Sequence, residues 1–242
     1  MVGRLPPPAA QYGAIAAFAE AVRLGFRYLE TDVHATKDGQ LVAFHDTHLD
    51  RVTDGRGAIA DVSSSDLASV RTAAGDAIPT LVEVLESFPA AHVNIDVKAA
   101  GAIAPLIETV RSMDVLDRIC VGSFSESRLR AVRKGLGPRL ATAAGQAGIV
   151  GLRYAPLPLS RLLHSSSPVL QIPRRHVVRG RRIELVTPAL VRRVHAVGKH
   201  LHVWTIDDPR EMTELLDLGV DGIVTDDLEA LTAVFAARGL RP

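Results

Sequence analysis

The chain has 242 residues, of which 47% are hydrophobic, enough to bury a sizeable core in one large α/β domain or two small ones. Its 28 basic and 27 acidic residues give a formal net charge of +1, which excludes a strong global field that would recruit nucleic acid or a membrane surface. The single cysteine, Cys120, excludes a disulfide framework and indicates a reducing compartment, where we expect a buried thiol.

The N-terminal stretch MVGRLPPPAAQYG contains one arginine and no apolar segment of the kind found in a signal peptide. No run in the chain approaches the roughly 18 apolar residues that a membrane span needs. We therefore expect a cytoplasmic protein with no transmembrane segment. We also expect an irregular segment over residues 1–14, followed by one domain over residues 15–242.

Helix and strand patterns alternate from residue 15 onward. An amphipathic helix ends at Gly25, and a strand is predicted over 26–33. The Asp38-Gly39 turn then returns the chain as a second strand, over 41–46, antiparallel to the first. The later predicted strands cover 92–98, 118–124, 139–144, 169–173, 201–207 and 222–226, and the later predicted helices cover 80–88, 103–113, 125–135, 187–198 and 209–219.

This alternation implies βαβ units and a parallel sheet. Seven strands qualify as parallel, those centred on residues 30, 96, 121, 141, 171, 203 and 224. A (β/α)8 barrel needs eight strands in roughly 250 residues, so the chain is one strand short, at its N-terminal end. A doubly wound sheet tolerates seven strands, and periodicity alone does not choose between the two folds.

Polar side chains gather on one face of two of the predicted strands. Because alternate residues of a strand point the same way, Glu30 and Asp32 share a face, and so do Asp96 and Lys98. The carboxylates fall near the C-terminal ends of their strands, where barrels and open parallel sheets build their sites. Three carboxylates from two strands repel one another unless a cation binds, and oxygen ligands favour Mg²⁺ or Ca²⁺.

Two further residues complete a site for phosphoryl transfer. Lys98 lies just outside the carboxylates and suits an anionic phosphate. His45, which the hairpin brings beside the pair, can transfer protons near neutral pH. The alternative is a structural role for these residues. An isolated E-x-D on a strand usually belongs to a solvent-exposed face, and Asp96 and Lys98 would then form only a structural ion pair. Trp204 is by default a core residue.

The sequence as a whole resembles the glycerophosphodiester phosphodiesterases. The matching stretches occur in the family's order and are YLETDVHATKDGQLVAFHDTHLDRVTDGRG (28–57), IPTLVEVLE (78–86), NIDVK (94–98), GSF (122–124), HVWTID (202–207) and GVDGIVTD (219–226). Family members are TIM barrels with a small hairpin after the second strand. The resemblance implies a (β/α)8 TIM-barrel type fold, here incomplete with its first β-strand missing, plus a hairpin after the strand of Glu30.

The resemblance also implies roles for individual residues. Glu30 and Asp32 match metal ligands, and Asp96 stands where the family has an acidic ligand. Lys98 matches the substrate-site lysine, and His45 matches one of two acid/base histidines. Trp204 matches an aromatic residue that lines the substrate pocket. The implied cofactor is one divalent cation, Mg²⁺ or Ca²⁺. Arg51 and Thr53 match motif positions that we interpret as mainly structural.

One departure from the family pattern concerns the N-terminus. Family members begin with a strand ending in His-Arg-Gly, which supplies the other acid/base histidine and a phosphate-contacting arginine, and a Glu-Asn-Thr opens their first helix. Here Tyr12, Gly13 and Ala14 fall where Glu-Asn-Thr belongs, and no His-Arg-Gly precedes them. We interpret the missing strand and the missing motif as one absence, which a start downstream of the true one would explain.

Three functions are compatible with these residues. The first is hydrolysis of a glycerophosphodiester, a small-molecule substrate, to glycerol 3-phosphate and an alcohol. The second is a catalytically impaired relative that binds a phosphate ligand or a partner without turnover. The third is a phospholipase of the sphingomyelinase D type, which the IPTL and VWTID matches disfavour. We expect weak or absent activity, because losing one positioned acid/base group typically costs about 10²- to 10⁴-fold in rate. No nucleic acid and no protein partner is predicted.

Overall fold

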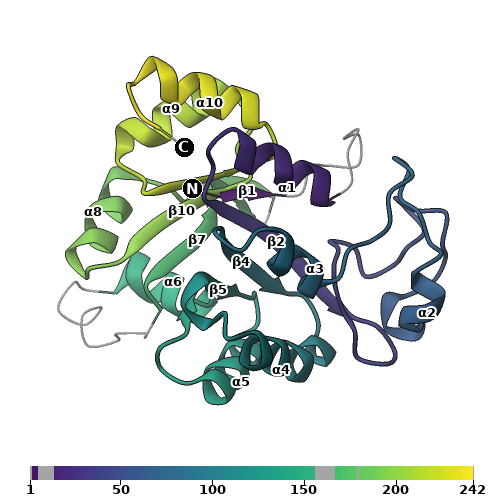
Figure 1. Ribbon diagram of the computed structural model, residues 1–242. Helices are drawn as coiled ribbons and strands as arrows, with labels where there is room; N and C mark the ends of the chain where they lie inside the picture. Colours follow the sequence, from purple (N-terminus) through teal and green to yellow (C-terminus); the bar gives the residue numbers. More distant parts are fainter. Residues whose placement is uncertain (1, 5–13, 156–166, 179, 242) are drawn as a thin grey trace.

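Eight parallel strands form a closed barrel in the part of the chain that this computed structural model describes, residues 2–4, 14–155, 167–178 and 180–241 (Figure 1). The strands are β1 (Val2–Arg4), β2 (Tyr28–Ala35), β4 (His92–Val97), β5 (Ile119–Gly122), β6 (Ala141–Thr142), β7 (Val169–Pro173), β10 (His200–Trp204) and β11 (Gly222–Thr225). Their order in the sheet is β6-β5-β4-β2-β1-β11-β10-β7. A parallel bridge between Ala143 and Val169 joins the two ends of this sheet, so the fold is a (β/α)8 barrel and not a doubly wound sheet.

Strand β1 corrects the expectation that the first strand is missing. It pairs in parallel with both β2 and β11, and Arg4 is level with Glu30. Three residues are too few to show the alternating pattern of a strand, and the Leu-Pro-Pro-Pro that follows is typical of a loop. The segment 1–14, predicted to be irregular, therefore contains a strand. Residues 5–13, where Tyr12 and Gly13 lie, are outside the described residues.

Helices cover the outside of the barrel (Figure 1). They are α1 (Ala14–Arg23), α3 (Leu81–Ser87), α4 (Ile103–Met113), α5 (Glu126–Leu136), α6 (Gln146–Tyr154), α8 (Pro188–Ala196), α9 (Pro209–Leu218) and α10 (Leu228–Ala237). Local signals set their ends. Thr80 and Glu83 form a capping box at the start of α3, and α9 begins with the N-cap Asp208 and ends at Gly219, whose φ of 85° is left-handed.

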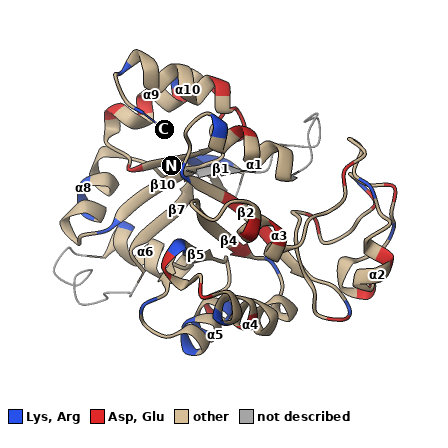
Figure 2. Cartoon of the chain, viewed as in Figure 1, with Lys and Arg blue, Asp and Glu red and all other residues tan. Residues whose placement is uncertain are grey.

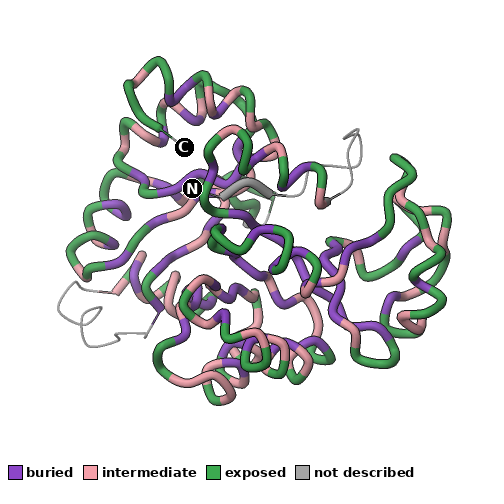
Figure 3. The backbone as a smooth tube through the Cα atoms, viewed as in Figure 1, coloured by how far each residue is buried: buried purple, intermediate pink, exposed green. Residues whose placement is uncertain are grey.

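The hydrophobic core lies between the barrel strands and these helices (Figure 3). Outward-facing strand residues are fully buried there, among them Leu29, Val33, Ile95, Val121, Leu170, Leu201 and Val203. The alternate residues of the same strands face the barrel interior and are largely polar. Basic and acidic residues are interspersed over the outer helices (Figure 2), as the near-zero net charge predicts. No helix in the described residues is long and apolar enough to cross a membrane.

Two excursions leave the barrel. The first follows β2 and comprises the antiparallel strand β3 (Leu41–Ala43), as predicted, and a polar segment with the short helix α2 (Ser64–Leu67). It has a small core of its own, made by Val42, Phe44, Leu49, Ile59, Leu67 and Ile78. The second follows β7 and is a two-stranded hairpin of β8 (Arg175–Val178) and β9 (Arg181–Glu184).

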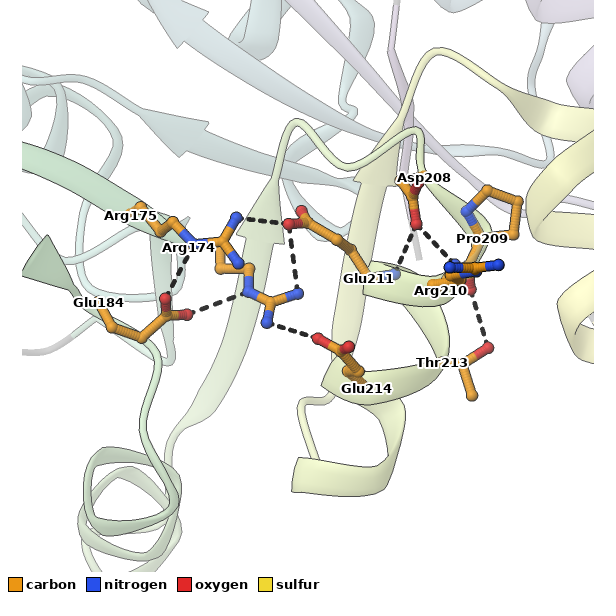
Figure 4. Close-up of polar contacts among 9 residues, drawn as sticks. All are labelled: Arg174, Arg175, Glu184, Asp208, Pro209, Arg210, Glu211, Thr213 and Glu214. Carbon is orange, nitrogen blue, oxygen red and sulfur yellow. Dashed lines mark hydrogen bonds and ion pairs between the residues drawn. The ribbon is translucent and has the colours of Figure 1, made fainter. Parts of the chain in front are cut away.

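Ion pairs fix the base of the β8–β9 hairpin to helix α9 (Figure 4). Arg174, whose side chain is 13% exposed, contacts Glu184 of β9 at 3.0 Å and Glu214 of α9 at 2.6 Å. Arg175 contacts Glu184 at 2.9 Å and also Glu211 of α9. The hairpin is therefore held at the end of the barrel where β7 and β10 finish.

Candidate active site

Three carboxylates lie on the inner face of two neighbouring strands, β2 and β4. Glu30 and Asp32 are 7% and 3% exposed, and Asp32 is level with Asp96 in the parallel register. They face the barrel interior because alternation places their neighbours Leu29 and Val33 in the outer core. Glu30, Asp32 and Asp96 thus share the barrel interior, as the sequence predicted.

Lys98 bridges two of these carboxylates. Its Nζ atom lies 2.9 Å from Asp32 Oδ1 and 2.9 Å from Asp96 Oδ2, and its side chain is 20% exposed. Burial disfavours the charge on this lysine, but attraction to the two aspartates outweighs that effect and raises the pKa of Lys98 above its ordinary value. The ammonium is therefore firmly charged.

A divalent cation fits the chemistry of this set of donors. Asp96 Oδ1 is buried and makes no hydrogen bond with any residue that the structure describes. A Cβ on Gly122 would lie 3.8 Å from this oxygen and 3.4 Å from Gln171 Oε1, so the glycine leaves a space lined by oxygen atoms. Within the described ranges, no group of three or more His, Cys, Asp or Glu side chains is arranged to hold a metal ion. The convergence of the three carboxylates on one ion remains a prediction.

Gln171, which the sequence analysis missed, crosses the barrel interior beside this space. Its Nε2 donates a hydrogen bond to Asn94 Oδ1 at 3.0 Å. Asn94 is level with Glu30 in the register, so the amide pair lies beside the carboxylates. A polar residue at the inward position of the apolar strand VLQIP was the available signal, but its partner 77 positions away was not visible in the sequence.

His45 is held by a chain of charged groups in the loop that follows β3. Its Nδ1 lies 2.7 Å from Asp46 Oδ1, and Arg51 binds the same carboxylate through Nε at 2.6 Å and Nη2 at 2.8 Å. The hydrogen bonds from Arg51 lower the pKa of Asp46 to about 2, with a smaller contribution from His45. The His45 side chain is 55% exposed, so its Nε2 side is open to a ligand.

Two other histidines near the site are engaged in packing. The Nε2 of His34 lies 3.2 Å from the carbonyl oxygen of His45, and burial lowers the pKa of His34. The ring of His202 lies against Gly222, where a Cβ would be 2.7 Å from it. Burial lowers the pKa of His202 to about 4, so this ring is neutral at pH 7.

An aromatic pair borders Lys98. Trp204 ends β10, and its ring meets that of Phe124 edge-to-face with the centroids 5.8 Å apart. Phe124 is 56% exposed, and its centroid is 5.9 Å from Lys98 Nζ. Phe124 was not among the predicted site residues, although it belongs to the GSF stretch. Cys120, expected to be buried, is only partly buried, and desolvation raises the pKa of its thiol to about 12.

This architecture defines an α/β-barrel protein with a charged, carboxylate-rich cluster at the C-terminal ends of its strands. The glycerophosphoryl diester phosphodiesterase family matches residues 13–230, and the chain belongs to that family. It is similar to a probable glycerophosphodiester phosphodiesterase 2 of Mycobacterium tuberculosis, at 40% identity over 93% of this chain and 86% of the relative. A glycerophosphodiester phosphodiesterase of Caldanaerobacter subterraneus is 32% identical over 90% of this chain and 89% of its own length. These homologues are phosphoric diester hydrolases.

Solved structures of family members have the same fold. A phosphodiesterase of Oleispira antarctica, crystallised with the product sn-glycerol 3-phosphate, aligns with a TM-score of 0.80 at 22% identity, over 98% of this chain and 96% of that one. A glycerophosphodiester phosphodiesterase of Agrobacterium tumefaciens aligns with a TM-score of 0.77 at 22% identity, over 97% and 98%. The alignments cover nearly the whole chain, so the barrel described above has the fold of these structures.

Proposed function

We propose that the protein is a metal-dependent phosphodiesterase that hydrolyses glycerophosphodiesters to glycerol 3-phosphate and an alcohol. The observation that carries this proposal is the cluster of Asp32, Asp96 and Lys98 inside the barrel, in a chain that belongs to the glycerophosphoryl diester phosphodiesterase family. The product bound to the Oleispira antarctica relative supports the substrate class. The family match supports this function over that of a sphingomyelinase D.

The charged residues of the site have complementary roles in this reaction. Glu30, Asp32 and Asp96 would hold one divalent cation, Mg²⁺ or Ca²⁺, which supplies positive charge for the phosphate oxygens when it is bound. Lys98 binds a non-bridging phosphate oxygen as a point charge. Trp204, with Phe124 beside it, lines the pocket for the organic part of the substrate. No nucleic acid or protein partner is part of this proposal.

His45 is the acid/base residue of the proposal. Its Nδ1 faces Asp46, which fixes the ring and favours a proton on that nitrogen, and Nε2 is left to exchange a proton with the substrate or with water. Hydrolysis forms a bond from the water oxygen to phosphorus and breaks the bond to the alcohol, which leaves with a proton. Arg51 acts indirectly, because it positions Asp46.

We infer further that turnover is slow. The chain has no histidine before His34, so β1 contributes no second acid/base histidine of the kind that the family resemblance implies. Losing such a group typically costs about 10²- to 10⁴-fold in rate. The missing histidine also leaves a second function possible, which is binding of a phosphate ligand without turnover. The experiment in the next paragraph distinguishes this function from slow catalysis.

Substitution of His45 tests the proposal. With glycerophosphocholine as substrate and Mg²⁺ or Ca²⁺ in excess, we expect slow release of glycerol 3-phosphate that chelation abolishes. His45→Ala should reduce kcat by a further factor of about 10² or more. His48→Ala is the matched control, because His48 is exposed in the same loop and hydrogen bonds to Thr47. Equal rates for the two variants would contradict the role of His45, and no release by any form would favour binding without turnover.

A further inference from the structure

The Lys98 ammonium lies between two of the three carboxylates that we propose as metal ligands. Two carboxylate oxygens, one from Asp32 and one from Asp96, meet at its Nζ atom at 2.9 Å each. Oxygen ligands of Ca²⁺ lie at about 2.3–2.6 Å, so the two side chains need to move by only a few tenths of an ångström to exchange the ammonium for that ion. A cation and the ammonium cannot occupy this point together.

We propose that Lys98 is the resident cation of the metal-free site, and that a divalent cation binds by displacing its ammonium toward the substrate phosphate. This inference rests on the proposed function and adds an order of events to it. The cation neutralises the two aspartates, and the released ammonium becomes available to an anion. Binding of the cation and binding of a phosphate ligand are therefore coupled through one side chain.

The backbone around Lys98 limits how this exchange can occur. The carbonyl oxygen of Val97 accepts hydrogen bonds from Ser123 Oγ at 2.8 Å and from Arg128 Nη1 at 2.6 Å, which fixes the end of β4. The ammonium must then move by rotation of its own flexible four-carbon stem. Its path leads toward Phe124, whose exposed ring lies 5.9 Å from Nζ.

Electrostatics supports an exchange in this direction. Asp32, which is buried, and Asp96, whose side chain is 15% exposed, lie at one level of neighbouring strands, where like charges repel each other. Lys98 relieves that repulsion with a single charge, whereas a divalent ion does so with two. Lys98 thus stabilises the metal-free protein and competes with the metal ion for the two carboxylates.

The competition is tested by calorimetric titration of Ca²⁺ and of Mg²⁺ into the purified metal-free chain. We expect Lys98→Met to bind the cation more tightly than the wild type, by about tenfold or more, because no ammonium has to be displaced. Lys98→Arg keeps the charge and should remain close to the wild type. Lys37→Met is the control for net charge, because Lys37 is exposed in the turn after β2. Equal or weaker binding by Lys98→Met would overturn the proposal.

A second measurement remains informative if Lys98→Met unfolds without metal. Added cation should then raise its midpoint of thermal unfolding more than that of the wild type, because tighter binding stabilises the folded state more. A smaller rise than in the wild type would overturn the proposal as well.

The coupling has its own readout in the binding of sn-glycerol 3-phosphate. In the wild type, the cation should raise the affinity for this ligand, and the ligand should raise the affinity for the cation by the same factor. In Lys98→Met this factor should be smaller, and an unchanged factor would refute the coupling. Metal-dependent turnover by the wild type, with no tighter binding by Lys98→Met, would refute this inference alone. If the wild type showed neither turnover nor cation binding, both this inference and the proposed function would be refuted.

Discussion

Gly3 lies in strand β1, which ends at Arg4. We propose that Gly3-Arg4-Leu5 is the counterpart of the His-Arg-Gly that the family resemblance implies, with the arginine retained. On this alignment the departure at β1 consists of two side chains, in addition to the departure at residues 12–14. We expect Gly3→His combined with Leu5→Gly to raise kcat/KM for glycerophosphocholine by about 10²- to 10⁴-fold, because it restores a second acid/base group.

The control for this double variant is Gly3→Ala with Leu5→Gly, which changes the backbone similarly but adds no imidazole. His45→Ala in the restored protein should remove the gain again. An unchanged rate in the double variant would mean that another group already serves, and His34 and His202 are the residues to test next. We expect neither to serve, because both rings are engaged in packing.

At this scale, the residues that follow from a local rule were predictable. Glu30, Asp32, Asp96 and Lys98 share a face because side chains in a strand alternate, and His45 follows a recognisable turn. Gln171 and Phe124 were not found, because their importance comes from contacts across the barrel, to Asn94 and Trp204. The ion pair of Lys98 with Asp32 was equally out of reach, since it depends on the register of β2 against β4, whereas its ion pair with Asp96 was one of the two interpretations of the sequence.

Between elements, the packing of β10 against β11 makes stability depend on pH. The ring of His202 fills the space above Gly222, and its Nδ1 has no hydrogen-bond partner among the described residues. Burial lowers its pKa to about 4, with Asp221 opposing and His200 adding to the shift. Between about pH 6.5 and pH 4 the unfolded chain binds a proton that the folded chain does not. Stability should therefore fall as the pH falls through this window, by at most about 3 kcal/mol.

His202→Gln removes this titration, so its free energy of unfolding should depend less on pH between about 6.5 and 4. The measurement is urea unfolding at several pH values, with His176→Gln, an exposed histidine of the β8–β9 hairpin, as the control. The control should keep the slope of the wild type. The same slope in His202→Gln would show that other groups cause the acid sensitivity.

Elements that carry their own signals were predictable, and those that need a partner were not. Caps such as the Thr80–Glu83 capping box indicate the helices, and the Asp-Gly turn indicates the β2–β3 hairpin. The β8–β9 hairpin lies in an arginine-rich stretch and owes its position to the glutamates of α9 (Figure 4). Strand β1 is stabilised by backbone pairing on both sides, which leaves no pattern in three residues.

At the scale of the whole molecule, closure of the barrel depends on β1. This strand fills the gap between β2 and β11, and without it both neighbours would expose unpaired backbone groups. Gly3→Pro removes the central N–H of the strand, so we expect it to lower the free energy of unfolding by about 2–4 kcal/mol and to promote aggregation through the exposed edges. Urea unfolding and light scattering measure the two effects. Gly3→Ala, which keeps the N–H, is the matched control. If both variants unfold at the same urea concentration, pairing at Gly3 does not hold the barrel closed, and the carboxylates of β2 keep their positions through β4 alone.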